Sequence, residues 1–180
     1  MQRLVSLFII GLLMVPGIGY SQNEEHENKE GKFKVTVPAG WKVRVDGSTS
    51  DLLAPPDAQL DEWSEYLGIS VNQTEGAKLA DTFNYYITED FPGYYSEFKV
   101  IRKGEEAING VKTLWVLFAF SNSTQLQGGK TKSAKLNNLF YFVEKNGMFY
   151  YLNGIAEESH FKDYESAFLE IVRSFKPGGM

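Results

Sequence analysis

The sequence predicts an α+β fold, in which a mainly antiparallel β-sheet is flanked by helices on both faces, an α/β/α sandwich. Asn109-Gly110 and Asn146-Gly147 each separate two runs rich in aromatic and β-branched residues, a strong signal for an antiparallel hairpin. Residues 111–120 are apolar at both alternating sets of positions, which is typical of a strand covered on both faces. Two amphipathic helical segments are available to cover those faces.

Residues 1–21 are predicted to be a signal peptide. Arg3 provides the positive start, residues 4–15 are largely apolar, and Gly19 and Ser21 are small residues before a cleavage point that precedes Gln22. The alternative is an uncleaved anchor helix, but the apolar run is shorter than the roughly 20 residues of a membrane span. We therefore expect an exported, soluble, periplasmic or extracellular protein. Residues 22–31 are expected to form a flexible acidic leader and residues 32–177 a single domain.

Charge and cysteine content exclude several classes of protein. Removal of Arg3 takes the formal charge from −5 to −6, which disfavours nucleic acid and anionic lipid surfaces as partners. The chain contains no cysteine, so it has no disulfide, no thiolate nucleophile and no cysteine-based zinc site. It also has no cysteine that could carry a lipid anchor, and we expect no membrane insertion after signal cleavage.

The first half of the domain reads as short strands separated by turns. Pro38-Ala39-Gly40 turns the chain before Trp41, and the prolines at 55 and 56 begin a loop that runs to Glu65, because proline has no amide hydrogen to donate to a sheet. We expect strands at residues 33–37, 42–45, 51–54 and 66–71.

The second half combines the two helices with the longest strands. Leu79, Phe83, Ile87 and Phe91 recur every four residues, which predicts a helix over residues 77–91 that ends at Pro92-Gly93. An extended segment (95–108), the strand 111–120, a polar loop (121–135) and the hairpin strands around Asn146-Gly147 follow. A last amphipathic helix begins near Phe161 and is stopped by Pro177.

Two motifs carry a resemblance to a known family. Residues 33–41 read Phe-x-Val-x-Val-Pro-x-Gly-Trp, and the last helix ends in Ser174-Phe175-Lys176. With the order of elements between them, they make residues 33–176 similar to the PsbP-like family, which includes the extrinsic subunit of the photosynthetic oxygen-evolving complex and many uncharacterised bacterial proteins. The resemblance implies an antiparallel sheet between helices and an accessory or binding role rather than catalysis. It carries over no catalytic residue and no ion-binding ligand set.

Motifs of catalysis are weak or incomplete. His160 is expected at the start of the last helix, and no Gly-x-Ser-x-Gly elbow presents a serine for it to activate. Gly128-Gly129-Lys130-Thr131 lacks the first glycine of a phosphate-binding loop and joins two hairpin strands. The acids Asp57, Asp61, Glu62 and Glu65 lack the spacing of an EF-hand loop and are expected to be solvated. We predict no catalytic residue, metal site or cofactor.

Aromatic residues on predicted loops are the candidates for binding. Most aromatics fall in predicted strands, where they pack well. Trp63 lies in the proline-rich loop, and Tyr94 and Tyr95 directly follow Pro92-Gly93. Exposed aromatics at such positions commonly anchor interfaces and sugar sites. The alternative is that these three side chains fold back onto the core.

The sequence thus favours an exported, non-enzymatic accessory or binding domain that engages a protein partner or small ligand in the cell envelope. One alternative is a carboxylate-dependent hydrolase of envelope glycans, which would need two facing acids, one of them with a raised pKa. Another is a structural module without a specific ligand.

Overall fold

The computed structural model describes residues 22–55, 65–125 and 131–178, and the predicted signal peptide lies outside them. The larger sheet is antiparallel throughout, with strand order β3-β4-β5-β9-β8-β7-β6. Its strands are β3 (Lys42–Asp46), β4 (Thr49–Leu53), β5 (Tyr66–Gln73), β6 (Ser96–Ile108), β7 (Val111–Gln125), β8 (Thr131–Lys145) and β9 (Met148–Glu157). The predicted α+β fold with a mainly antiparallel sheet is confirmed.

Both predicted Asn-Gly turns are present. Asn109 and Gly110 have φ of 48° and 78°, and Asn146 and Gly147 have φ of 53° and 75°. Positive φ at both central residues is what a type I′ hairpin turn requires, and asparagine and glycine tolerate it best. These turns set the registers of the β6–β7 and β8–β9 hairpins.

The first helical segment is longer than the predicted helix over residues 77–91. It consists of α1 (Leu79–Tyr85), a π-helical turn η1 (Tyr86–Asp90) and α2 (Phe91–Tyr94). Pro92 was expected to end the helix, but it stands in the first turn of α2. Proline removes a hydrogen bond and clashes with the preceding turn of a regular α-helix, and the wider π-helical turn lies directly before it. The segment therefore continues to Tyr94.

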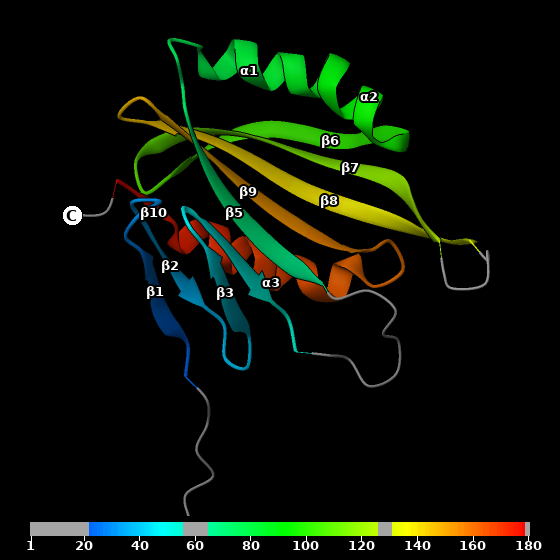
Figure 1. Cartoon of the computed structure of the whole chain (residues 1–180), viewed down its shortest axis with the longest axis horizontal. Coiled ribbons are helices and arrows are strands. Elements are labelled where there is room, and N and C mark those ends of the chain that lie inside the picture. Colours follow the sequence, from blue (N-terminus) through cyan, green and yellow to red (C-terminus); the bar gives the residue numbers. More distant parts are fainter. Residues whose placement is uncertain (1–21, 56–64, 126–130, 179–180) are drawn as a thin grey trace, which may run out of the picture.

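Alternate residues of β8 pack in two different apolar clusters. Phe140 and Phe142 join buried residues of α1, η1 and α2. Tyr141 and Val143 join buried residues of α3 (Phe161–Ser174). Because successive side chains of a strand point to opposite faces, the sheet lies between these clusters (Figure 1).

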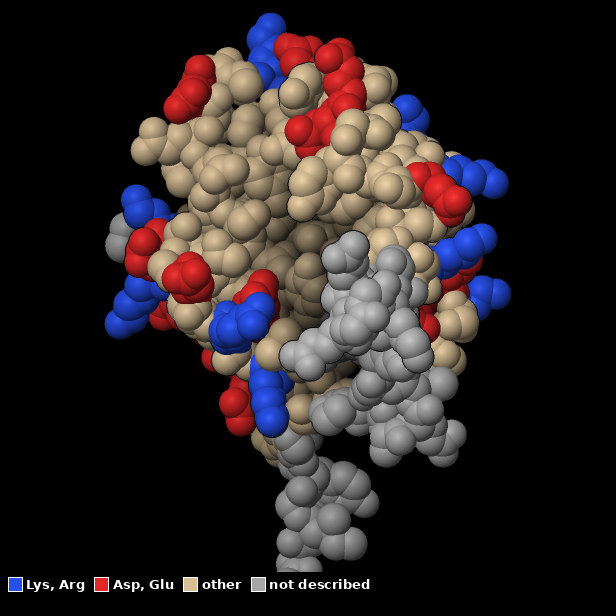
Figure 2. Space-filling view, turned by 45° about the vertical axis from the view of Figure 1, so that its right-hand side comes forward, with Lys and Arg blue, Asp and Glu red and all other residues tan. Residues whose placement is uncertain are grey.

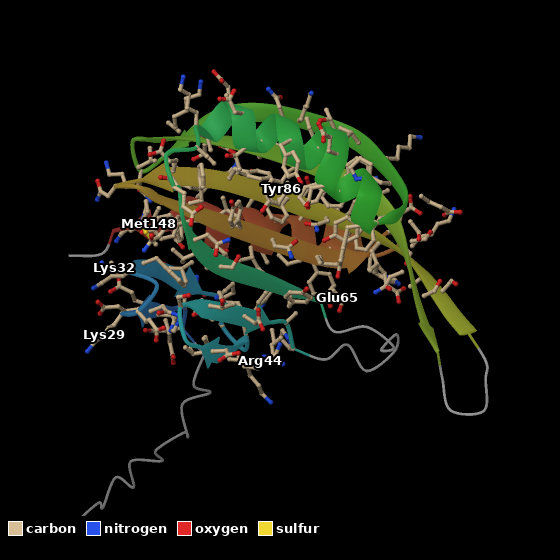
Figure 3. All side chains as sticks on the ribbon, turned by 45° about the horizontal axis from the view of Figure 1, so that its top comes forward. Lys29, Lys32, Arg44, Glu65, Tyr86 and Met148 are labelled. Atoms are coloured by element: carbon tan, nitrogen blue, oxygen red, sulfur yellow. The ribbon has the colours of Figure 1, made fainter. Side chains whose placement is uncertain are left out.

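Tyr86 links the first helical segment to the sheet (Figure 3). Its ring centroid lies 5.3 Å from that of Phe142 and 5.6 Å from that of Tyr151, and it also contacts Phe91 at 5.2 Å. Edge-to-face and tilted aromatic pairs at such distances stabilise the fold by more than the burial of their apolar surface alone would. This aromatic contact fixes the segment that carries Tyr94 and Tyr95.

The segment predicted as a flexible leader is instead largely a strand. β1 (Glu24–Asn28) pairs with β2 (Phe33–Val37), which also pairs with β10 (Lys176–Pro177) in a second, three-stranded sheet. Asn28 is buried, and its side-chain Nδ2 donates to the backbone oxygen of Gly47 (3.1 Å). The prediction failed because strand pairing satisfies backbone groups and does not require apolar side chains at an exposed edge.

The predicted polar loop over residues 121–135 is also shorter than expected. β7 extends to Gln125 and β8 begins at Thr131, with Ser123 opposite Ser133 in the register. The Oγ atoms of these two serines lie 2.8 Å apart and share a hydrogen bond. Figure 1 shows the outer part of this hairpin extending beyond the neighbouring strands, and its backbone pairing continues to Gln125 and Thr131.

Candidate binding site at the end of helix α2

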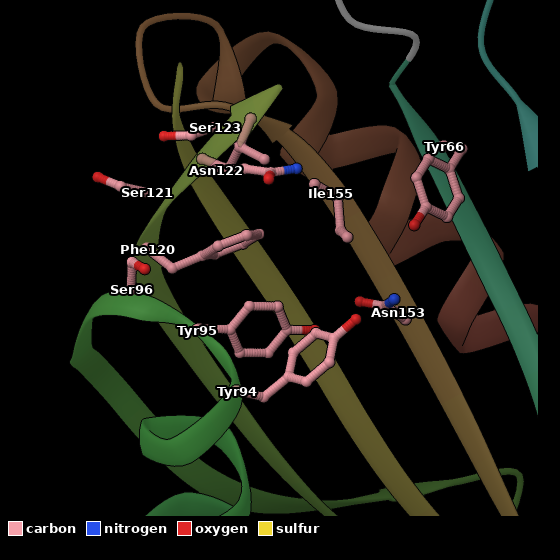
Figure 4. A pocket seen from close by; sticks show the side chains of 11 residues that line it. Tyr66, Tyr94, Tyr95, Ser96, Phe120, Ser121, Asn122, Ser123, Asn153 and Ile155 are labelled. Atoms are coloured by element: carbon pink, nitrogen blue, oxygen red, sulfur yellow. The ribbon is translucent and has the colours of Figure 1, made fainter. Parts of the chain in front are cut away.

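A cavity of about 430 Å³ opens where the end of α2 meets strands β5, β7 and β9. Figure 4 shows its side chains at close range, and Figure 2 shows a hollow bordered mainly by uncharged residues. Every lining side chain is uncharged, and tyrosine, serine and asparagine predominate. The volume falls in the lower part of the range of about 300–1,000 Å³ that is common for small-ligand pockets.

The chain changes from helix to strand at Tyr94 and Tyr95. The N–H of Tyr95 donates to the carbonyl oxygen of Phe91 (2.8 Å) and closes the last helical turn, and Tyr95 then adopts an extended backbone. Tyr94 is 80% exposed, whereas Tyr95 is half-buried. The two rings meet edge to face with their centroids 5.0 Å apart. One tyrosine thus forms the rim of the cavity and the other forms its wall.

Tyr95 is anchored in the core by its ring. The centroid lies 4.4 Å from that of Phe120, 5.4 Å from that of Phe118 and 5.6 Å from that of Phe91. The alternative that the candidate aromatics fold back onto the core therefore describes Tyr95 in part, but it does not describe Tyr94. Trp63, the third candidate, lies outside the described residues. The assignment of these three residues to a binding site remains a prediction.

The opposite wall comes from strands β5 and β9. Tyr66 stands directly opposite Ile155 in the register, and Tyr66, Asn153 and Ile155 all line the cavity. Figure 4 shows Tyr66 and Asn153 across the cavity from Tyr95. The Oδ1 atom of Asn153 is buried and has no hydrogen-bond partner in the described part of the chain. A buried acceptor without a partner is costly, which makes Asn153 a candidate for a ligand contact.

The third wall is the end of strand β7. Phe120, Ser121, Asn122 and Ser123 line the cavity there. The hydroxyl of Ser121 donates to Oε2 of Glu97 (2.5 Å), so its proton is already engaged. The Asn122 side chain is also directed towards the cavity in Figure 4 and adds an amide to this wall.

Burial raises the pKa of two tyrosine hydroxyls of the cavity, those of Tyr95 and Tyr66. It raises the pKa of Tyr95 to about 12, with smaller contributions from the neighbouring phenols of Tyr66 and Tyr94 and from Asp90. Burial likewise raises the pKa of Tyr66, and Asp51 adds to this effect. Both phenols are neutral hydrogen-bond donors and acceptors at physiological pH.

The raised pKa of Tyr95 predicts a specific alkaline sensitivity. The folded protein favours the neutral phenol, so this group contributes its full stabilisation below pH 10.0 and loses it as the pH rises towards about 12. We expect Tyr95→Phe to reduce the loss of stability between these values. Thermal unfolding followed by circular dichroism from pH 9 to 12 checks this, and identical pH profiles for the two proteins would count against a buried Tyr95 hydroxyl.

Several site residues were missed by sequence reasoning. Tyr66 was assigned only to a strand, and neither Asn153 nor Asn138, which is buried beneath the cavity lining, was predicted as a site residue. A signal was nevertheless present, because asparagine is unfavourable within strands and both asparagines interrupt apolar runs.

The acids Asp57, Asp61 and Glu62, considered for a carboxylate site, lie outside the described residues. Glu65, the fourth of these acids, is buried directly before β5.

Within residues 22–55, 65–125 and 131–178, no group of three or more His, Asp or Glu side chains could hold a metal ion. None of the helices in these ranges is both long and apolar enough to cross a bilayer.

Comparison with known proteins shows which solved structures share the fold of this chain. No protein-family model and no curated protein sequence matches it. Among solved structures, cyanobacterial PsbP (CyanoP) from Synechocystis has a TM-score of 0.59 at 13% identity, over 93% of this chain and 98% of that one. LpqN of Mycobacterium tuberculosis, described as involved in cell envelope biogenesis, has a TM-score of 0.62 at 11% identity, over 86% and 90% of the two chains.

The Ran-binding protein Mog1p of Saccharomyces cerevisiae has the same fold, with a TM-score of 0.57 at 12% identity over 87% of this chain and 96% of that one. Identities this low show the fold alone. The resemblance to PsbP-like proteins inferred from residues 33–41 and 174–176 is confirmed at that level, and the chain has a PsbP-like fold.

Proposed function

We propose that this protein is an exported, non-enzymatic binding domain of the cell envelope, built as a PsbP-like α/β/α sandwich, and that it binds its ligand or partner at the cavity beside Tyr94 and Tyr95. The observation that carries the proposal is the combination of an uncharged cavity with an exposed tyrosine at its rim. A large aromatic side chain left 80% exposed beside a cavity is a typical anchor for a bound molecule.

Two further points support a binding role. Among the described residues, the cavity wall contains no carboxylate, histidine or lysine side chain that could act as a general acid or base. The proteins of similar fold include one described as Ran-binding and one described as involved in cell envelope biogenesis. Export rests on the predicted signal peptide at residues 1–21. The hydrolase alternative would require a pair of facing acids, and none lines the described cavity.

Alanine at Tyr94 is expected to weaken retention of the bound molecule by about tenfold or more, because anchor tyrosines commonly contribute well over 1 kcal/mol to binding. Its melting temperature should change little, since the ring is 80% exposed. The measurement is retention from an envelope extract of the native host on the immobilised protein. Tyr95→Ala is less informative, because that ring packs against Phe118 and Phe120.

Tyr85→Ala is the matched control. Tyr85 lies in the same helical segment, is 52% exposed and does not line the cavity. A partner kept by Tyr85→Ala and lost by Tyr94→Ala supports the proposed site. Equal retention by all three proteins would place binding elsewhere, and a large fall in the melting temperature of Tyr94→Ala would show that the ring is structural.

A further inference from the structure

We propose that the cavity binds a short, uncharged saccharide of one or two rings, held by the side-chain amide of Asn153 in its wall, by that of Asn138 directly beneath its lining, and by tyrosine rings at its walls. This inference rests on the proposed function, because it specifies the ligand of the same site. It depends on three properties of the cavity: unpartnered amides in and beneath its lining, aromatic walls with polar tips, and no charge among the described residues that line it.

Asn138 is the least expected residue of strand β8. It is fully buried, and neither its Nδ2 nor its Oδ1 atom has a hydrogen-bond partner in the described part of the chain. It stands opposite Phe118 of β7 and Ile155 of β9. By strand alternation it shares the face of Leu136 and Phe140, which belong to the cluster below the first helical segment. A buried polar group without a partner is costly, which makes Asn138 a candidate for function rather than packing.

Asn138 does not itself line the cavity but lies directly beneath residues that do. Its cross-strand neighbour Ile155 and its same-face neighbour Leu136 both line the cavity, as does Phe120 diagonally across from it on β7. The second amide, Asn153, faces Phe140 in the register and is therefore the diagonal neighbour of Asn138 on β9. Asn153 lines the cavity, whereas a ligand reaches Asn138 by displacing the apolar side chains above it, and the two amides then offer donors and acceptors to one small molecule.

The tyrosines complement a sugar ring. Tyr66, Tyr94 and Tyr95 each combine an apolar ring face with a hydroxyl. A pyranose has the matching pattern, with C–H groups on its faces and hydroxyls around its edge. Vicinal hydroxyls can each accept from an amide N–H and donate to an amide oxygen, which would satisfy the atoms that Asn138 and Asn153 leave unpaired.

Other classes of ligand fit this cavity less well. A charged ligand would lose hydration without gaining an ionic partner among the described residues that line the cavity, because none of them is charged. A purely apolar ligand would leave the buried amides unpaired. At about 430 Å³ the cavity has room for one or two sugar rings rather than a long chain.

The test is calorimetric titration of the full protein with uncharged disaccharides: maltose, cellobiose and N,N′-diacetylchitobiose. Glucuronic acid serves as the charged probe and N-acetylglycinamide as the neutral amide probe. We expect at least one disaccharide to bind and neither of the other probes to do so. Asn138→Leu should weaken binding by about tenfold or more and at the same time raise the melting temperature, because it removes an unsatisfied buried amide.

Asn137→Leu is the matched control. Asn137 is the adjacent residue of β8, is also buried and also has an unpartnered Oδ1 atom, but by strand alternation it shares the opposite face with Leu139. It should leave saccharide binding unchanged. Equal loss of binding in both variants would overturn the assignment, because it would trace the loss to general changes in β8.

The remaining outcomes separate this inference from the proposed function. If no saccharide binds, or only N-acetylglycinamide does, while retention from extract still depends on Tyr94, the saccharide inference is overturned and the binding site stands. If no saccharide binds and Tyr94 has no effect on retention, both are overturned.

Discussion

Replacing Phe142 with alanine is expected to lower the free energy of unfolding by about 3–5 kcal/mol, the usual cost of truncating a buried phenylalanine. Phe142 is fully buried in β8. Its ring centroid lies 5.2 Å from that of Phe83, 5.3 Å from that of Tyr86 and 6.3 Å from that of Phe91. It therefore contacts each part of the first helical segment, and its loss should loosen the segment that holds Tyr94.

Urea unfolding of wild type and Phe142→Ala measures this effect, with Ile101→Ala as the control. Ile101 is an apolar residue of β6 that is 48% exposed, and its truncation should change the free energy of unfolding by about 0.5 kcal/mol or less. If Phe142→Ala cost no more than Ile101→Ala, the helical segment would not be packed on β8 as described.

The second large effect concerns Gly154 and Phe168 on the other face of the sheet. A Cβ atom at Gly154 would lie 2.9 Å from Cγ of Phe168, which is fully buried in α3 and contacts Trp41. Gly154→Ala should therefore cost about 1–3 kcal/mol through overpacking. Phe168→Ala should cost about 3–5 kcal/mol through the cavity that it leaves.

The double variant tests this contact directly. Once Phe168 is truncated, the methyl group of Gly154→Ala has room, so the second substitution should cost much less than it does alone. The resulting coupling energy should fall within about 0.5–3 kcal/mol, as for residues in contact. If the changes in unfolding free energy caused by the two single substitutions simply added in the double variant, Gly154 and Phe168 would not be in contact.

The sequence predicted those parts of the fold that depend on local chemistry. The turn at Asn146-Gly147 needs positive φ, and the stripe from Leu79 to Phe91 needs a surface to cover, so both are visible in a short window of sequence. β1 and the outer part of the β7–β8 hairpin were not predicted. They depend on backbone pairing with the next strand of the chain, which polar side chains neither specify nor prevent.

The candidate site was predicted only at its rim. Tyr94 and Tyr95 drew attention because they follow Pro92-Gly93, a local signal. Tyr66, Asn138 and Asn153 belong to three strands, and only the register of β5, β9 and β8 brings them together. An isolated asparagine in an apolar strand marks a position that packing does not explain, but it does not identify its neighbours.

The most direct test of the binding site is photo-crosslinking from the rim of the cavity. The protein would carry p-benzoylphenylalanine in place of Tyr94 or, as the control, in place of Tyr85, and would be irradiated in the native envelope and analysed by mass spectrometry. We predict a defined mass increase from position 94 and none from position 85, and the added mass distinguishes a small ligand from a protein. A crosslink from position 85 alone, or from neither position, would contradict the assignment of the cavity as the binding site.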